Sequence, residues 1–328
     1  MKNLSRRSAT AALLTAAASG VGVGHARAGN WPERPVTWLV PYPAGGGSDL
    51  FARPVAAGVG EKLRQTMVID NRSGAGGTIG TAVAARAAPD GYTLLVGDTG
   101  LTYAPVVYPN AGFDFGHDFA PICALARVPY VLVVNPERIG VRDLAEFIAV
   151  AKKDPDGIDI GSPGLGTVAH LAIGLFEQRA GVKLHHVPYR GGGPMLQDLL
   201  AGQIAGAFVV LSAAVSLVAS GRLVALGVAG RRRERLLPDV PTMQEGGVGD
   251  FRVPIWFGLF APSRTPDAIL DRLHAAVQAV LAEEKIRRLW AEQGARVEPE
   301  SRADFARFVA ADAERWIRIA RTAKIQME

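Results

Sequence analysis

The stretch Pro41-Tyr42-Pro43-Ala44-Gly45-Gly46-Gly47-Ser48-Asp49 sets the fold of this 328-residue chain. It joins an apolar run, Val36 to Val40, to a segment whose apolar residues recur at helical spacing from Phe51 to Leu63. We therefore expect a strand, a glycine turn and a helix start. Successive glycines let the backbone expose its N–H groups, and Ser48 or Asp49 can cap the helix, so the turn predicts an anion site. The glycines alone are equally consistent with a tight turn that binds no ligand.

A second turn of the same design, Gly161-Ser162-Pro163-Gly164-Leu165-Gly166-Thr167, follows more than a hundred residues downstream. A third, Arg190 to Gly193, precedes a helix that we expect to begin with Pro194 and to stop at Gly202. Two such turns can face each other across one binding site.

Strand and helix patterns alternate along the chain, which predicts an α/β fold. We expect an irregular segment from Leu101 to Phe119, between two blocks of this pattern. The expected strands are Val36 to Val40, Met67 to Ile69, Tyr92 to Val96, Val128 to Val134, Ile158 to Ile160, His185 to Tyr189, Leu223 to Val228 and Trp256 to Pro262. Expected helices include Thr78 to Ala88, Val141 to Lys153, one capped by Thr167, and two closing helices that begin near Pro266 and Ser301.

The first 28 residues have the features of an export signal. A basic start is followed by small apolar residues from Ala9 to Gly24 and by Ala26-Arg27-Ala28, so we expect cleavage after Ala28 and a periplasmic protein. The secretory and twin-arginine routes both remain open, and a non-cleaved tail is the alternative. No cysteine stands directly after the cut and no later apolar run is long enough for a bilayer span, so we expect neither a lipid anchor nor a transmembrane helix.

Charge and cysteine content exclude several classes of protein. The formal charge of +5 includes four cations in the export signal, which holds no acid, so the remainder carries only +1. This argues against a nucleic-acid partner. A single cysteine, Cys123, excludes an internal disulfide and a cysteine metal cluster. The run Arg231-Arg232-Arg233-Glu234-Arg235 is interpreted as a solvated surface loop rather than a phosphate patch, because a glutamate interrupts it.

Motifs of cofactor binding and catalysis fail on spacing. Gly74 and Gly76 begin a dinucleotide-like fingerprint, but Ile79 stands where the third glycine belongs, and no P-loop sequence occurs. Ser162 lacks the first glycine of a nucleophile elbow. His185 and His186 are adjacent and should point to opposite faces of a strand. We therefore predict no cofactor, no metal and no catalytic residue.

Seven ordered motifs resemble those of the Bug family of periplasmic solute receptors, the binding components of tripartite tricarboxylate transporters. They are the Pro41 to Asp49 stretch, Asn71-Arg-Ser-Gly-Ala-Gly-Gly, Pro89-Asp-Gly-Tyr-Thr-Leu-Leu, Val187-Pro-Tyr-Arg-Gly, Asp198-Leu-Leu-Ala-Gly-Gln, Pro238-Asp-Val-Pro-Thr and Trp256-x-Gly-Leu-x-Ala-Pro. The resemblance implies a type II periplasmic-binding-protein fold, with two α/β lobes joined by crossing strands and a ligand cleft between them. Mapped here, lobe one is 29–127 with 252–328, and lobe two is 128–251.

The resemblance also implies a monomeric receptor that captures a small carboxylate and delivers it to integral-membrane transporter subunits. A sensor without a transporter and an exported enzyme are the alternatives. The implied ligand-binding residues are Tyr42, Ala44, Gly45, Gly46, Ser48, Asp49, Thr99, Ser162, Gly164, Thr167 and Tyr189. Among these, a capping role for Asp49 is favoured over ligand contact. His170 is interpreted as a packed or capping histidine.

The chain departs from the family pattern at two places. Where many members have aspartates after Gly-Gln, this sequence has Ala205 and Val209, so we expect the ligand not to be an amino acid. A mono- or dicarboxylate with an apolar or aromatic body is favoured, with Tyr42, Tyr103, Tyr189 and Trp256 as candidate aromatic contacts that are equally consistent with core positions. Pro54 falls inside the first helix, which we expect it to bend.

Overall fold

The computed structural model describes residues 30–322. The predicted export signal, Met1 to Ala28, lies outside the described residues. None of the helices described has the length and apolar character needed to cross a membrane.

The first of two lobes is built on strands that surround the first glycine turn. Strand β1 is parallel to β2 and β3, and β9 is antiparallel to β3. The bounds are β1 Val36–Val40, β2 Met67–Asn71, β3 Thr93–Asp98 and β9 Pro254–Pro262. The chain leaves this sheet after β3 and re-enters it at β9. Both ends of the described chain therefore contribute to the first lobe.

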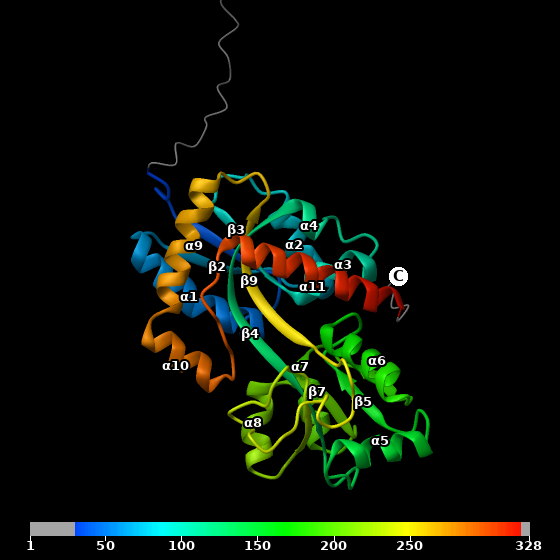
Figure 1. The fold of residues 1–328 in the computed structure, drawn as a ribbon. Helices are drawn as coiled ribbons and strands as arrows, with labels where there is room; N and C mark the ends of the chain where they lie inside the picture. The colour runs from blue at the N-terminus through cyan, green and yellow to red at the C-terminus, as the bar shows by residue number, and fades with distance from the viewer. Residues whose placement is uncertain (1–29, 323–328) are drawn as a thin grey trace, which may run out of the picture. The chain divides into compact units, whose positions relative to one another are not determined.

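Strand β4 (Phe119–Val134) belongs to both lobes. Its first part, Phe119 to Pro129, pairs antiparallel with β9, and its last five residues pair with β7 and β8. The strands of the second lobe are β5 Asp159–Ser162, β6 His185–Pro188, β7 Gly206–Val210 and β8 Val224–Val228. The sheet order is β2-β1-β3-β9-β4-β7-β5-β6, with β8 beside β4, and Figure 1 shows β4 and β9 running from one lobe into the other.

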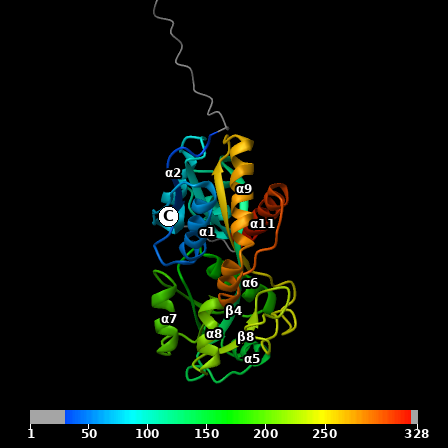
Figure 2. The ribbon, with the colours of Figure 1, turned by 90° about the vertical axis from the view of Figure 1, so that its left-hand side faces the viewer.

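Helices cover the sheets of both lobes (Figures 1 and 2). Those outside the second lobe are α1 Gly47–Leu63, α2 Thr78–Ala85, α3 Thr99–Val107, α4 Phe115–Asp118, α9 Asp267–Leu281, α10 Glu284–Glu292 and α11 Arg302–Thr322. Those of the second lobe are α5 Leu144–Lys153, α6 Val168–Ala180, α7 Gly192–Leu200 and α8 Leu211–Ala219. Three of these helices, α1, α6 and α7, begin at the three glycine-rich turns.

Two of the aromatic residues considered as ligand contacts lie in the core. Tyr103 and Trp256 are fully buried. The indole N–H of Trp256 donates to Oδ2 of Asp312 at 2.8 Å, and its ring packs edge-on against Phe305. Burial of rings of this size accounts for much of the apolar stabilisation of the first lobe.

The segment expected to be irregular, Leu101 to Phe119, instead forms α3 and α4 and the start of β4. The side chain of Asp98 caps α3 by accepting the N–H of Leu101 at 3.2 Å, and Asp114 caps α4 in the same way. These two aspartate caps are sequence signals that the prediction missed, and α3 also holds Pro105 inside it.

Smaller corrections concern helix ends and prolines. Helix α2 ends at Ala85 rather than Ala88, and Pro194 is the third residue of α7 rather than its first. Pro54 lies inside α1 as expected, and the helix continues past it to Leu63.

Candidate functional site

The first glycine turn leaves a row of backbone donors at the start of α1. Gly46, in extended conformation, is the N-cap residue and has no side chain to cap with, which corrects the expectation that Ser48 or Asp49 occupies that position. Within residues 30–322, the N–H groups of Gly47, Ser48 and Asp49 have no hydrogen-bond partner. The positive end of a 17-residue helix therefore presents three free donors.

Asp49 holds this turn from inside the helix. Its carboxylate accepts the N–H of Gly45 at 3.0 Å, Nη2 of Arg53 at 2.6 Å and Nδ2 of Asn71 at 3.2 Å. Burial opposes ionisation, but these hydrogen bonds outweigh it and lower the pKa of the Asp49 carboxyl. The carboxylate is thus occupied by the turn itself.

Tyr42 and Asp98 link the first turn to the start of α3. The Tyr42 hydroxyl donates to Oδ1 of Asp98 at 3.1 Å, and the same oxygen accepts the N–H of Leu101. Burial raises the pKa of Asp98 to about 6, even though these hydrogen bonds favour the charged form. Thr99 is fully buried, and its Oγ1 accepts the N–H of Trp256 at 3.1 Å. Sequence reasoning missed Asp98, although an aspartate between a strand and a helix is a recognisable cap.

The second glycine turn is held by its own side chains. Thr167 caps α6 as predicted, accepting the N–H of His170 at 3.4 Å, and its hydroxyl donates to the Gly164 carbonyl at 2.8 Å. Ser162 is fully buried, with its Oγ 3.0 Å from the Gly164 carbonyl and 2.7 Å from Nε2 of His186. The backbone path of this turn is therefore fixed by hydroxyl groups.

Two histidines pack behind this turn. The rings of His170 and His186 stack with centroids 4.0 Å apart, and Nδ1 of His170 accepts the N–H of Gly166 at 3.1 Å. Burial, reinforced by the neighbouring His186, lowers the pKa of His170 to about 4. Burial also lowers the pKa of His186. Both rings are therefore neutral near pH 7, and the interpretation of His170 as a packed histidine is confirmed.

The contact between Ser162 and His186 resembles one part of a hydrolase triad. A triad also needs an exposed hydroxyl and an acid that orients the histidine. Ser162 is fully buried, and the nearest strand acid, Asp159, contacts His185 instead, at 2.7 Å. In the described part of the chain, no acid contacts His186, so the constellation is incomplete.

Tyr103 joins the first lobe to the second turn. Its hydroxyl donates to the Gly166 carbonyl at 3.1 Å. Gly166 has a φ of +70°, and a Cβ added there would lie 2.5 Å from Cγ1 of Val107, so α3 sits directly against the turn. At the other end, a Cβ on Gly164 would lie 3.2 Å from the Tyr189 carbonyl. The contacts thus run from Tyr42 through α3 to the second turn and on to Tyr189.

The Tyr189 side chain faces α7 in this structure. Its hydroxyl donates to Oδ2 of Asp198 at 2.9 Å, and its backbone N–H donates to the Ser162 carbonyl. The roles of the eleven predicted residues in ligand binding stay a prediction. The structure places Thr99 and Ser162 in buried hydrogen bonds. Ala44, Gly45, Gly46 and Ser48 lie in the first turn; the N–H groups of Gly45 and Gly46 donate within the turn, and that of Ser48 is free in the described structure.

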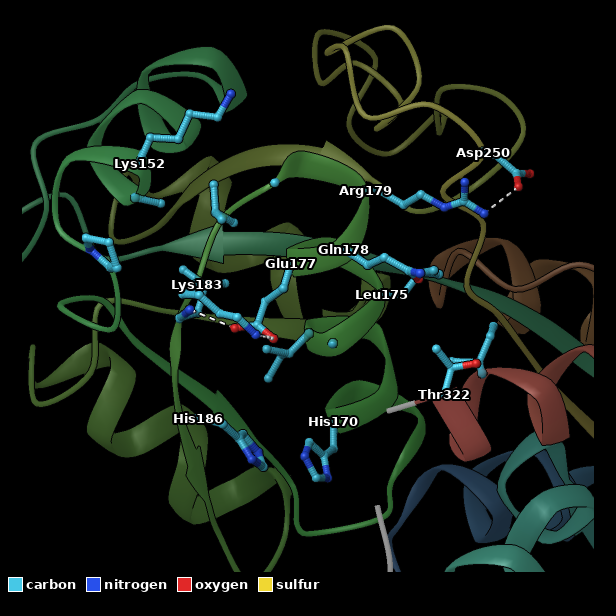
Figure 3. A pocket seen from close by; sticks show the side chains of 18 of the residues that line it. Lys152, His170, Leu175, Glu177, Gln178, Arg179, Lys183, His186, Asp250 and Thr322 are labelled. Atoms are coloured by element: carbon cyan, nitrogen blue, oxygen red, sulfur yellow. Dashed lines mark hydrogen bonds and ion pairs between the residues drawn. The ribbon is translucent and has the colours of Figure 1, made fainter. Parts of the chain in front are cut away.

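A cavity of about 980 Å³ lies elsewhere, against α5, α6 and the end of α11 (Figure 3). It overlaps the turn region only at His170 and His186, which Figure 3 shows side by side. Charged pairs line it, including Arg179 with Asp250 at 2.9 Å. It contains none of the predicted ligand-binding residues. Within residues 30–322, no group of three or more metal-binding side chains occurs.

Comparison with known proteins gives a consistent set of matches. Residues 51–325 match the model of the tripartite tricarboxylate transporter family receptor. Protein BugT of Bordetella pertussis is 34% identical over 296 residues, which are 90% of this chain and 90% of that protein. The structure of R. palustris Rpa4515 with adipate has a TM-score of 0.83 and 36% identity, covering 90% of this chain and 100% of that one. MatC (Rpa3494) from Rhodopseudomonas palustris with bound malate has a TM-score of 0.79 and 34% identity, covering 88% and 99%.

Proposed function

Because this chain belongs to the tripartite tricarboxylate transporter receptor family, close to the Bug proteins, we propose that it captures a small carboxylate in the periplasm and delivers it to the membrane subunits of a tripartite transporter. Proteins of this family are periplasmic solute-binding receptors. The two α/β lobes found here are those of a type II periplasmic-binding protein.

The observation that carries the proposal is the row of free N–H groups on Gly47, Ser48 and Asp49. They bind a carboxylate without a buried cation, since the helix dipole and the backbone donors supply the favourable field. The second turn lies within reach through the hydrogen bond from Tyr103 to Gly166. Similar proteins hold dicarboxylates, namely adipate and malate, which fits two donor-rich turns.

Ligand capture on this arrangement requires the lobes to move. Lobe one is proposed as 29–127 with 252–328 and lobe two as 128–251, since β4 exchanges β9 for β7 and β8 between Pro129 and Tyr130. Each turn alone supplies half of the donors, so closure desolvates the carboxylate. Small-angle scattering of the protein cleaved after Ala28 should show a smaller radius of gyration with a bound ligand. An unchanged radius with confirmed binding rejects closure.

The proposed ligand is a mono- or dicarboxylate rather than an amino acid. Ala205 and Val209 are buried and offer no charge for an ammonium group. Asp98 is the acid at the start of α3, but one of its oxygens already accepts two hydrogen bonds. Calorimetric titration with C4 to C6 dicarboxylates, aromatic carboxylates, aspartate and glutamate tests this choice. Micromolar binding of an amino acid without binding of the plain acids contradicts it.

The protein that binds the receptor distinguishes delivery to a transporter from sensing. We expect the tagged receptor to be a monomer. When saturated with its carboxylate, it should co-purify with the integral-membrane subunits. Capture of a signalling protein instead would favour the sensor.

An exported hydrolase is the second candidate, because Ser162 contacts His186 at 2.7 Å. Incubation with esters and amides of the bound acids, followed by mass spectrometry, decides it. Turnover that Ser162→Ala abolishes would establish an enzyme, whereas saturable binding without product supports the receptor.

A further inference from the structure

A second cavity, of about 750 Å³, lies beside the strands that connect the lobes. Its walls come from β4 at Arg127 to Pro129, from the loop after β8, from the residues before β9, and from α11. None of the predicted carboxylate-binding residues lines it. It is therefore distinct from the site described above.

Arginine dominates the charge of this cavity. Six arginines line it, namely Arg127, Arg231, Arg232, Arg252, Arg296 and Arg315, against four acids, namely Glu234, Glu298, Glu300 and Asp312. At neutral pH the cavity thus carries a formal excess of two positive charges. The sequence interpretation of the run from Arg231 to Arg235 as exposed loop holds for its arginines, yet two of them face this cavity.

Within residues 30–322, three of the six guanidinium groups form no hydrogen bond or ion pair. Arg127 forms two hydrogen bonds of 2.9 Å with Glu300, and Arg296 pairs with Glu234. Arg315 donates to the Arg252 carbonyl and lies 3.7 Å from Asp312. Among the described residues, the side chains of Arg231, Arg232 and Arg252 form no hydrogen bond or ion pair, and neither does Glu298.

The cations are also close enough to affect one another. Burial lowers the pKa of Arg315, Asp312 and Asp250 raise it, and the charge of Arg252 in this cavity lowers it further, as does that of Arg179 outside it. A bound anion would relieve this repulsion. The guanidinium group donates in a planar fork that matches phosphate oxygens, so crowded, unpaired arginines favour a multiply charged phosphate ligand.

We propose that this cavity is a second binding site, specific for a phosphate-bearing anion with at least two negative charges. Arg231 and Arg232 hold it from the second lobe, and Arg252 and Arg315 hold it from the connection to β9 and from α11. Phe308 and Pro254 supply an apolar wall for an organic body. The volume is within the usual range for small-molecule sites.

The test is calorimetric titration of the full mature chain with inorganic pyrophosphate and with inorganic phosphate at low ionic strength. We expect binding at micromolar strength, tighter for pyrophosphate. The double substitution Arg231→Ala/Arg232→Ala should weaken it at least tenfold. Because both side chains are exposed and unpaired, the melting temperature should not change.

The matched control is Arg222→Ala/Arg235→Ala, which removes the same charge from exposed, unpaired arginines outside this cavity. We expect its pyrophosphate affinity to stay within twofold of the wild type. Equal weakening by both pairs would show only non-specific attraction and would overturn the proposal. A Gly46→Val variant, at a φ of −74° that any residue adopts, should bind pyrophosphate normally while losing carboxylate affinity, which separates this site from the carboxylate site.

A phosphate group can come from a soluble anion or from a lipid headgroup. Sedimentation with phosphatidylglycerol vesicles, with phosphatidylcholine vesicles as control, distinguishes the two. Vesicle binding that Arg231→Ala/Arg232→Ala abolishes would assign the lipid source. Absence of both pyrophosphate and vesicle binding would refute the site.

Discussion

The two glycine turns begin helices in the same way but satisfy their backbone groups differently. In the first turn, the N–H groups of Gly47, Ser48 and Asp49 remain free in the described structure. In the second, the Thr167 side chain accepts the third of the corresponding groups, the N–H of His170, and the first two stay free in the described structure. The first turn therefore presents three free donors, whereas the second has a threonine cap on one of the three and also lies against α3.

This difference teaches that a glycine-rich turn has two separable uses. One use keeps side chains away from donors, and the other lets another helix approach. Gly46 has a φ of −74°, which any residue adopts, whereas Gly166 has a φ of +70° and lies against Val107. Substitutions at the two positions should therefore fail for different reasons.

The largest expected effect is that of Gly166→Val. A Cβ there would lie 2.5 Å from Cγ1 of Val107, and a β-branched residue is strained at this φ, so we expect a loss of about 3 kcal/mol in the free energy of unfolding. Denaturant unfolding measures it. Gly46→Val should cost no more than about 1 kcal/mol but weaken carboxylate binding at least tenfold, because its side chain borders the free donors. Normal binding by Gly46→Val would contradict the proposed donor row, and equal stability losses would erase the distinction between the turns.

Replacement of Asp49 tests how much its carboxylate stabilises the first turn. Asp49→Ala leaves the N–H of Gly45 without its acceptor and removes one of the two acceptors of the Asn71 amide, which should cost about 2 kcal/mol at pH 7. Because the pKa of Asp49 is lowered in the folded protein, its contribution is present above the unfolded pKa of about 3.9 and is lost as the pH falls below it. The difference between wild type and variant should therefore shrink at pH 3.

The control for this experiment is Asp70→Ala. Asp70 pairs with Arg72 at 2.8 Å, but both side chains are substantially exposed, so the loss should stay below about 0.5 kcal/mol. If Asp49→Ala costs no more than this control, the turn does not depend on the carboxylate.

Sequence reasoning predicted the parts of this molecule that local patterns determine. The strand before Pro41 and the helices after the three glycine turns follow from apolar periodicity and caps, and the structure confirms them. The motif order led to the family and therefore to the two lobes, which no periodicity in residues 119–134 would indicate, since β4 changes its pairing partners partway along.

What the sequence left out depends on contacts between distant residues. The stacking of His170 on His186, the hydrogen bond from Tyr103 to Gly166 and the pairing of Tyr42 with Asp98 span 16, 63 and 56 positions. Hydroxyl and carboxyl groups in such contacts look like candidate ligands in a sequence. The structure shows several of them, including Thr99 and Ser162, engaged in buried hydrogen bonds.

Asp98 should make the affinity of the first turn for a carboxylate depend on pH. Its pKa of about 6 means that it becomes charged as the pH rises from 5.5 to 8, and a charged carboxylate repels a carboxylate ligand. We expect affinity to fall roughly fivefold across this range, about 1 kcal/mol. Since folding raises the pKa of Asp98, this group also increases the free energy of unfolding as the pH falls through 6. Titration of Asp98→Asn, which keeps a capping side chain, separates the effect from ionisation of the ligand. Identical pH profiles for the variant and the wild type would remove Asp98 from the site.

The smallest expected effects come from removing one hydroxyl in each region, with Tyr42→Phe and Tyr189→Phe. The Tyr42 hydroxyl stabilises the charged form of Asp98, so its loss should shift the midpoint of the pH profile of binding upward and change affinity at pH 7 about twofold. The Tyr189 hydroxyl donates to Asp198 instead, so Tyr189→Phe should cost about 1 kcal/mol of stability and leave that midpoint in place. Calorimetry between pH 5.5 and 8 on both variants gives the comparison. A tenfold loss of affinity in Tyr189→Phe would mean that this hydroxyl leaves Asp198 for the ligand when the lobes close, and the second turn would then contribute side-chain donors as well as backbone.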